Sequence, residues 1–179
     1  SCIVGEPTNP EELGGMAKIG RRGSFTGWVT VNGTQGHTAY PHLADNPLSR
    51  LVRMMAPLAE EQLDQGSAHF PPTTVAIASI DTGNTVTNVI PAKATASFNI
   101  RFNDLQTADS IETWLRGIFD DVGGSYELTT ACSSNAFVTE PGALSDDLLA
   151  AVDEVLGVTP ELSTTGGTSD ARFIRAHCP

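Results

Sequence analysis

The sequence predicts an α+β fold, in which a four-stranded antiparallel sheet carries two helices on one face. Four short segments read as strands, two longer segments place apolar residues three and four positions apart, and their order is β-α-β-β-α-β. Most of the strands have one apolar face and each helix has one apolar stripe. The economical packing therefore places both helices on the same face of the sheet. This arrangement is a ferredoxin-like sandwich spanning about residues 23–134.

The first strand and the first helix are predicted at residues 23–32 and 47–65. Between residues 23 and 32 apolar and polar residues alternate, with Phe25 and Val29 on one face and Trp28 on the other. Asn46 is a typical N-cap and Pro47 suits the first helical position. An apolar stripe follows, and Gly66 is expected to close the helix.

The remaining strands of the sandwich are predicted at residues 73–81, 93–102 and 125–133. A second helix lies before the last strand, capped by Thr107 and closed by Gly123. A third amphipathic helix between Gly142 and Gly157 has no place in a complete sandwich. We therefore expect residues 1–22 and 135–179 to be two flanks of a second domain, into which the segment 23–134 is inserted.

The strand at residues 73–81 is expected to form an edge of the sheet. It carries small, mostly uncharged residues, without the lysine or proline that normally protects an edge. Its free backbone groups can pair with the same strand of a twofold mate. The sequence thus predicts a homodimer through this strand, together with the first helix.

Composition excludes several classes of partner. The formal net charge of −11 makes nucleic acid a poor ligand, because such binding depends on clustered cations. No apolar run reaches the roughly 20 residues that span a bilayer, and no secretory signal pattern opens the sequence. The three cysteines have no metal-like spacing. We expect a cytoplasmic protein that binds neither nucleic acid nor membrane.

Two histidines, His37 and His42, lie between the first strand and the first helix. Pro41 prevents a helix between them, so the pair is a weak metal motif. A structural and a catalytic role for His37 both remain open from the residues alone.

Glu6 and Arg101 allow two interpretations each. Glu6 lies in a Gly-Glu-Pro turn that can hold a carboxylate with little freedom, although an exposed turn glutamate is the plainer interpretation. Arg101 lies on the strand face opposite the helices, where it is either a carboxylate ligand or a solvated surface arginine. The run from Lys18 to Arg22 holds three cations and is a possible anion site or a basic turn.

Six short motifs in order give the chain a more specific resemblance. They are Gly5-Glu-Pro-Thr8, Gly20-Arg-Arg-Gly23, Gly36-His-Thr-Ala-Tyr-Pro-His42, Asn88-Val-Ile-Pro91, Phe98-Asn-Ile-Arg101 and Gly166-Gly-Thr-Ser-Asp170. Together they resemble the di-zinc aminoacylase and carboxypeptidase family, specifically its members that cleave succinyl amides. The resemblance covers essentially the whole sequence but only the middle half of such an enzyme.

The resemblance implies a dimerisation and lid domain inserted into an α/β zinc-hydrolase domain. It further implies hydrolysis of N-succinyl-L,L-2,6-diaminopimelate, for lysine and diaminopimelate biosynthesis, with two Zn²⁺ or Co²⁺ ions. His37 matches the histidine that reaches the active site of the partner subunit and binds the oxygen of the tetrahedral intermediate. Glu6 matches a metal ligand. The positions matching substrate-binding residues are Arg21, Asn88, Arg101, Gly167, Thr168 and Ser169.

The sequence also departs from the family. Ala171 stands where the family pattern has glycine, and most of the metal ligands and the general base are absent from these 179 residues. By itself this portion is therefore expected neither to bind zinc tightly nor to hydrolyse the amide. Two alternatives are a free-standing ferredoxin-like module that dimerises and senses a small ligand, and the lid of a related deacylase of the acetylornithine type.

Overall fold

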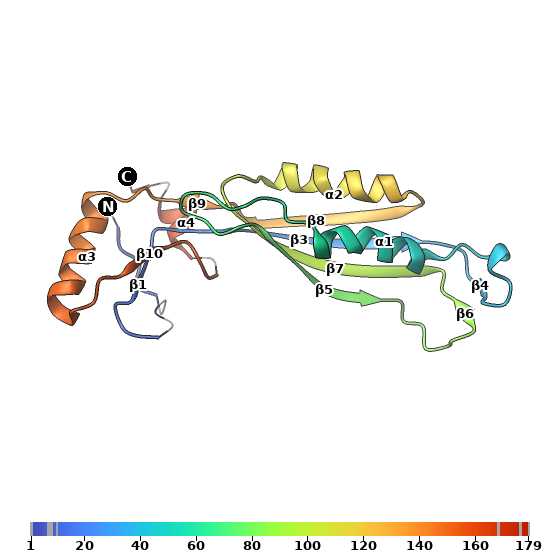
Figure 1. Ribbon diagram of the computed structural model, residues 1–179. Coiled ribbons are helices and arrows are strands. Elements are labelled where there is room, and N and C mark those ends of the chain that lie inside the picture. The colour runs from blue at the N-terminus through green and yellow to red at the C-terminus, as the bar shows by residue number, and fades with distance from the viewer. Residues whose placement is uncertain (1, 7–8, 10, 168, 176, 179) are drawn as a thin grey trace.

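The computed structural model describes residues 2–6, 9, 11–167, 169–175, 177 and 178. The described part of the chain is elongated, with a four-stranded sheet in the middle and the two chain ends together at one side (Figure 1). The strands are β1 (Met16–Lys18), β2 (Gly20–Arg21), β3 (Gly23–Asn32), β4 (Gly36–His37), β5 (Thr74–Asp81), β6 (Val89–Ile90), β7 (Lys93–Phe102), β8 (Tyr126–Ser134), β9 (Phe137–Val138) and β10 (Glu161–Ser163). The helices are η1 (Pro41–Leu43), α1 (Pro47–Glu60), α2 (Ala108–Val122), α3 (Ala143–Leu156) and α4 (Ala171–Ile174).

The central sheet has the strand order β5-β7-β3-β8 with every neighbouring pair antiparallel. The prediction of a mixed helix and strand fold with such a sheet is confirmed, and β5 lies at an edge as expected. The predicted face assignment also holds, because the even-numbered residues of β7 from Ala94 to Phe102 are all buried. The opposite face is mainly polar, and Trp28 lies half-exposed on it.

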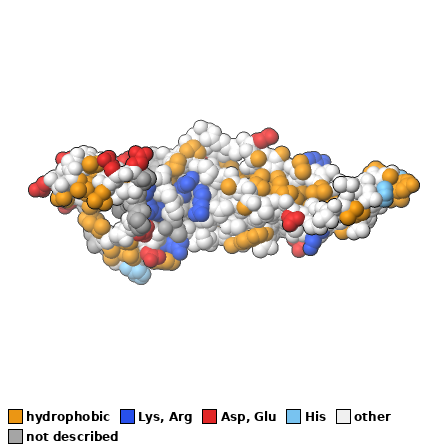
Figure 2. Space-filling view, turned by 90° about the horizontal axis from the view of Figure 1, so that it is seen from below, with side chains coloured by type: hydrophobic (Ala, Val, Ile, Leu, Met, Phe, Trp, Pro, Cys, Tyr) orange, Lys and Arg blue, Asp and Glu red, His pale blue; other side chains and the backbone are white. Residues whose placement is uncertain are grey.

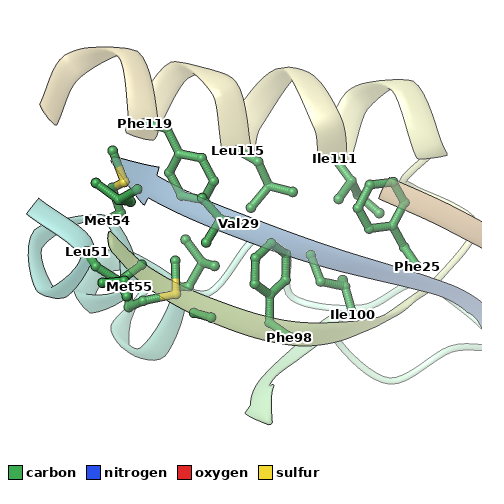
Figure 3. Close-up of a cluster of buried hydrophobic side chains, with 14 of the residues drawn as sticks. Phe25, Val29, Leu51, Met54, Met55, Phe98, Ile100, Ile111, Leu115 and Phe119 are labelled. Atoms are coloured by element: carbon green, nitrogen blue, oxygen red, sulfur yellow. The ribbon is translucent and has the colours of Figure 1, made fainter. Parts of the chain in front are cut away.

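The core lies between the sheet and the helices α1 and α2 (Figure 3). Each buried aliphatic or aromatic side chain there contributes about 1.5–3 kcal/mol relative to an exposed one. Gly27 allows close approach of two strands, since a Cβ atom at this position would lie 2.5 Å from Cε2 of Phe98. The helices and the two central strands contribute to one cluster, which includes Phe25, Val29, Leu51, Met54, Met55, Phe98, Ile100, Ile111, Leu115 and Phe119.

The predicted end of the first helix at Gly66 is wrong, because α1 ends at Glu60. Glu61 adopts an extended conformation, and its N–H donates to the carbonyl of Pro57 as the last helical bond. Beyond it, Asp64 Oδ1 accepts from the N–H groups of Gly66 (2.9 Å) and Thr73 (3.0 Å). These bonds hold the segment 61–73 in a loop. Hydrogen bonds from one side chain to distant backbone groups leave no periodic pattern in the sequence, so the end of the helix could not be predicted from it.

The two flanks of the sheet pair with each other. β1 and β10 form a parallel pair that aligns Met16 with Glu161, and β2 pairs antiparallel with β9. These pairs bring the segments before β3 and after β8 to the same end of the sheet (Figure 1). The helix α3 buries none of its described side chains, and Val155 is 78% exposed.

Candidate functional site

The residues singled out by the sequence form two groups at opposite ends of the sheet. Glu6, Arg21 and Ser169 lie at the junction with the flanks, whereas His37 lies beyond the far end of β3 (Figure 1). The ten-residue strand between them is roughly 30 Å long at about 3.3 Å per residue. The side chains of the two groups therefore cannot meet within one chain.

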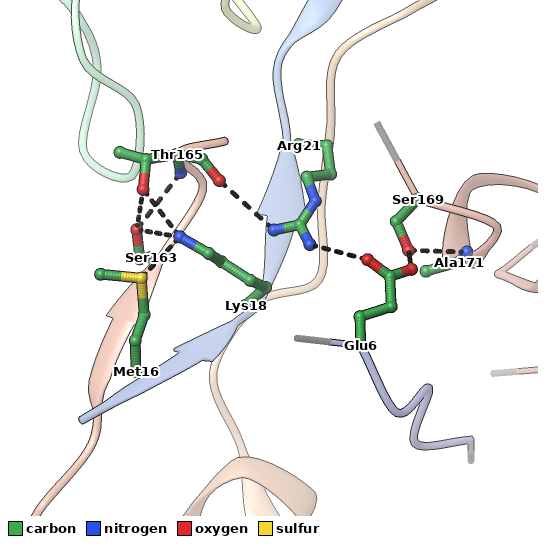
Figure 4. A network of polar contacts seen from close by, with 8 residues as sticks. All are labelled: Glu6, Met16, Lys18, Arg21, Ser163, Thr165, Ser169 and Ala171. Carbon is green, nitrogen blue, oxygen red and sulfur yellow. Dashed lines mark hydrogen bonds and ion pairs between the residues drawn. The ribbon is translucent and has the colours of Figure 1, made fainter. Parts of the chain in front are cut away.

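Glu6, Arg21 and Ser169 form a hydrogen-bonded cluster at the junction (Figure 4). Arg21 Nη2 lies 3.3 Å from Glu6 Oε2, and Ser169 Oγ donates to the other carboxylate oxygen. Arg21 is 5% exposed and also donates to the carbonyl of Thr165 at 3.3 Å. Its Nε atom is buried without a hydrogen-bond acceptor among the described residues. The cluster thus ties Glu6 to Thr165 and Ser169, which follow β10, and leaves one buried donor of Arg21 without an acceptor among the described residues.

Lys18 is a second cation at the junction, and it belongs to the basic run that is interpreted above as a possible anion site or a basic turn. Its ammonium group donates to Thr165 Oγ1 at 2.7 Å and to Ser163 Oγ at 3.2 Å. Burial lowers the pKa of Lys18, and the positive charge of Arg21 lowers it further. The basic run in the sequence could have suggested this neighbour, but only the pairing of β1 with β10 brings Lys18 to the loop 163–169.

Arg22 and Arg101 lie together on the polar face of the sheet, at its junction end. Arg101 is aligned with Thr74 of β5, and Arg22 Nη1 donates to Thr74 Oγ1 at 3.3 Å. Burial lowers the pKa of Arg22, with a further contribution from the charge of Arg101. Among the described residues no carboxylate forms an ion pair with either arginine.

On the face turned away from α2, Lys and Arg side chains gather near this junction (Figure 2). Two neighbouring guanidinium groups without a counter-ion suit an anionic ligand.

His37 is exposed, and its imidazole is held in one tautomer. Its Nδ1 accepts a hydrogen bond from the N–H of Ala39 at 3.0 Å. A ring nitrogen that accepts carries no proton, so the proton of the neutral ring lies on Nε2. Tyr40 stacks at an angle against the ring, with centroids 5.9 Å apart. His37 can therefore donate one hydrogen bond outward from Nε2.

Asn88 lies beside His37 because β4 and β6 pair. His37 is aligned with Val89, and the N–H of Thr38 donates to the carbonyl of Asn88 at 3.0 Å. The side chain of Asn84 fixes the same turn by donating to the carbonyl of Val89 at 2.9 Å. His37 and Asn88, both predicted site residues, are thus exposed neighbours at this end of the sheet.

The described residues do not form a metal site by themselves. No group of three or more His, Cys, Asp or Glu side chains within the described part of the chain could hold a metal ion. Glu6 can supply one carboxylate, whereas a zinc site needs three or four protein ligands. Of the two remaining predicted substrate-binding residues, Gly167 is exposed after β10, and Thr168 lies outside the described residues.

The helices in the described part of the chain are all too short or too polar to span a bilayer.

Solved structures with a similar fold include peptidases and other hydrolases. A tripeptidase from Staphylococcus aureus superposes with a TM-score of 0.71 and 17% identity, covering 91% of this chain and 43% of that one. An M20 family metallo-carboxypeptidase from Sulfolobus solfataricus gives a TM-score of 0.69 with 14% identity, covering 87% and 48%. At these identities the likeness concerns the fold.

Curated relatives are much more similar in sequence. The succinyl-diaminopimelate desuccinylase of Rhodospirillum centenum is 60% identical over 179 residues, covering 100% of this chain and 46% of the relative. The enzyme of that name from Parvibaculum lavamentivorans is 58% identical, covering 99% and 46%. The chain thus spans about half the length of the curated relatives it matches. Residues 19–127 match the family model of the M20 peptidase dimerisation domain. The chain belongs to the M20 peptidase dimerisation domain family.

Proposed function

We propose that this chain is the lid and dimerisation portion of a longer, metal-dependent amide hydrolase. The proposed reaction is the cleavage of N-succinyl-L,L-2,6-diaminopimelate to succinate and L,L-diaminopimelate. The names of the similar curated relatives support this substrate. The observation that carries the proposal is the separation of His37 from Glu6 and Arg21 along the sheet, because one copy of the chain cannot bring these residues together and a second copy would have to supply His37.

We propose that residues 23–134 are a ferredoxin-like insert and that residues 1–22 and 135–179 belong to the hydrolase domain. The strand order and the two helices that share one core support the insert. The parallel pairing of β1 with β10 supports a common domain for the two flanks. The two Zn²⁺ or Co²⁺ ions of the proposed enzyme would take Glu6 as one ligand and the others from outside this sequence. The cytoplasmic location expected from the sequence stays a prediction.

The proposed homodimer forms through β5 and α1. β5 has a single neighbour in the sheet, which leaves the backbone groups of its other side available. Val52 on α1 and Ile80 on β5 are 58% and 50% exposed, and they lie on neighbouring elements. Pairing about a twofold axis would cover both side chains and join two sheets into one.

The proposed site residues have distinct chemical roles. His37 of one copy donates from Nε2 to the developing oxyanion in the other copy, where a preorganised donor is most effective. Arg101, with Arg22 beside it, binds a substrate carboxylate. Arg21, Asn88, Gly167, Thr168 and Ser169 orient the remaining polar groups of the substrate.

The test is the full-length protein with His37→Ala, assayed with N-succinyl-L,L-2,6-diaminopimelate. Loss of one oxyanion donor predicts a fall in kcat of roughly 100- to 1000-fold. His42→Ala is the matched control, because His42 is exposed on the same loop and has no proposed role. Wild-type kcat in the His37→Ala variant would refute the role of this residue. A higher kcat/KM of the unsubstituted protein for N-acetylornithine than for N-succinyl-L,L-2,6-diaminopimelate would refute the proposed substrate.

A further inference from the structure

The loop that carries His37 is closed at its base by a short backbone bridge. It runs from residue 33 to residue 45 between β3 and α1. The N–H of Thr34 donates to the carbonyl of Asp45 at 2.9 Å, and the N–H of Asp45 donates back at 3.0 Å. Gly36 lies against the inner side of the loop, where an added Cβ would come within 2.6 Å of the Ala44 Cβ. The loop is therefore a compact unit whose direction is set at its base.

Arg50 of α1 contacts both ends of this loop. Its guanidinium donates to the carbonyl of Asn32, the last residue of β3, and to the carboxylate of Asp45. The Arg50 side chain is only 12% exposed, whereas that of Asp45 is 51% exposed. The planar guanidinium can bind two acceptors in a fixed geometry, which an ammonium group cannot do.

The structure behind Arg50 is capped and closely packed. Asn46 caps α1 by accepting from the N–H of Leu48 at 3.0 Å. Leu51 and Met54, which follow Arg50 on the helix, are fully buried in the core. On the other side, Gly124 has φ +87°, and an added Cβ there would lie 2.6 Å from Arg50 Nε. The guanidinium thus occupies a confined space between the helix and the turn before β8.

His37 itself has few contacts that could fix its position. Within the described residues the hydrogen bond and the ring contact of its imidazole both come from its own loop, from Ala39 and Tyr40. The pair β4–β6 adds two aligned residues on each strand. Since catalytic groups misplaced by about 1 Å can cost roughly 100-fold in rate, an exposed loop needs a firm base.

We propose that Arg50 is a positioning residue, which clamps Asn32 and Asp45 so that His37 points in the direction its reaction requires. This inference rests on the proposed role of His37 in the full-length enzyme. Arg50 touches neither substrate nor reacting atoms, and it acts only through the loop 33–45.

The test compares Arg50→Met, Arg50→Lys and Arg53→Met in the full-length protein. Arg53 lies on the same helix, is exposed, and within the described residues donates a hydrogen bond only to the carbonyl of Ser49, at 3.2 Å. For Arg50→Met we expect kcat to fall about tenfold or more while KM stays within about twofold. Arg50→Lys should recover part of kcat, and Arg53→Met should be unchanged. A rise in KM with unchanged kcat would overturn the proposal.

Combination with His37→Ala separates positioning from a general effect. If Arg50 acts through His37, Arg50→Met causes no further loss of kcat in the His37→Ala background. An equal loss in both backgrounds would overturn the inference. Wild-type kcat in His37→Ala would instead refute the proposed function on which the inference rests. If His37→Ala lowers kcat as expected but Arg50→Met leaves kcat unchanged, the positioning role of Arg50 is refuted while the proposed function stands.

Asp45→Asn provides a second variant in case Arg50→Met unfolds. It removes the carboxylate but leaves the bond from Arg50 to the carbonyl of Asn32, so we expect a smaller fall in kcat with the same KM. Amide ¹⁵N relaxation on this chain should show greater motion at His37 in Asp45→Asn than in Arg53→Met. Equal motion of His37 in both variants would contradict the clamp.

Discussion

At the scale of single residues, Asp64 shows how one carboxylate organises a segment without regular structure. Besides the N–H groups of Gly66 and Thr73, its oxygens accept from Asn103 Nδ2 at 2.6 Å and from Gln106 Nε2 at 3.4 Å. Burial is the largest single influence and raises the pKa of Asp64. The hydrogen bonds from Thr73, Gly66 and Asn103 together outweigh it, so that the pKa lies below its ordinary value of 3.8.

The lowered pKa of Asp64 predicts a dependence of stability on pH. A carboxyl group whose pKa is lower in the folded state stabilises the fold above its ordinary pKa, and this contribution disappears as pH falls through the folded-state value. For Asp64→Asn we therefore expect a Tm a few degrees lower at pH 7, since about 1 kcal/mol corresponds to roughly 2–4 °C at this size. The difference from the unsubstituted chain should shrink at pH 3.

Calorimetry of the chain at pH 7 and pH 3 checks this prediction. Asp147→Asn is a suitable control, because Asp147 is exposed on α3. A difference between the Asp64 variant and the unsubstituted chain that stays constant across this pH range would contradict the argument.

At the scale of elements, β5 and α1 present the surface on which the proposed dimer depends. Val52 and Ile80 are half-exposed apolar side chains beside an open strand edge. We predict that Val52→Glu shifts the chain from dimer to monomer, because a carboxylate buried in the interface would lack a counter-ion.

Light scattering at micromolar concentration measures this change in mass. Leu105→Glu is the matched control, because Leu105 is 56% exposed but lies in the loop before α2. A dimer that persists in Val52→Glu, or an unsubstituted chain that is monomeric, would exclude α1 and β5 as the interface.

The elements also show which local signals were sufficient. The alternation in β3 and β7 and the caps at Asn46 and Thr107 predicted both central strands and both helix starts. The sequence places the end of α1 five residues too late, because the segment after Glu60 is held in a loop by Asp64 through partners as distant as Asn103. Local periodicity carries no information on such contacts.

At the scale of the whole molecule, the length of the sheet separates the two groups of site residues. This separation predicts that two inactive variants can complement each other in one dimer. Glu6→Ala disables the site to which its own subunit contributes the flank, and His37→Ala disables the site of its mate. A mixed dimer therefore keeps one intact site, formed by the flank of the His37→Ala subunit and His37 of the other.

Coexpression of the two full-length variants, with different affinity tags, measures this complementation. Random pairing gives half mixed dimers with one working site each, so about a quarter of wild-type activity should return. Coexpression of His37→Ala with a doubly substituted chain, which carries both changes, is the control and should stay inactive. Mixed dimers of Glu6→Ala and His37→Ala without activity would contradict the transfer of His37 between subunits.

The sequence by itself determined the four strands of the central sheet, the starts of α1 and α2 and the apolar faces of β3 and β7, because these follow from spacing and capping residues within short segments. The edge position of β5 follows from the strand order expected of such a sheet. Only the tertiary structure decided which side chains meet. Arg21 bonds to Glu6 while its neighbour Arg22 lies beside Arg101, and Arg50 reaches both ends of the loop that carries His37. The physical reason is that these contacts join residues brought together by strand pairing and by the packing of helices on the sheet, and neither leaves a periodic pattern in the chain.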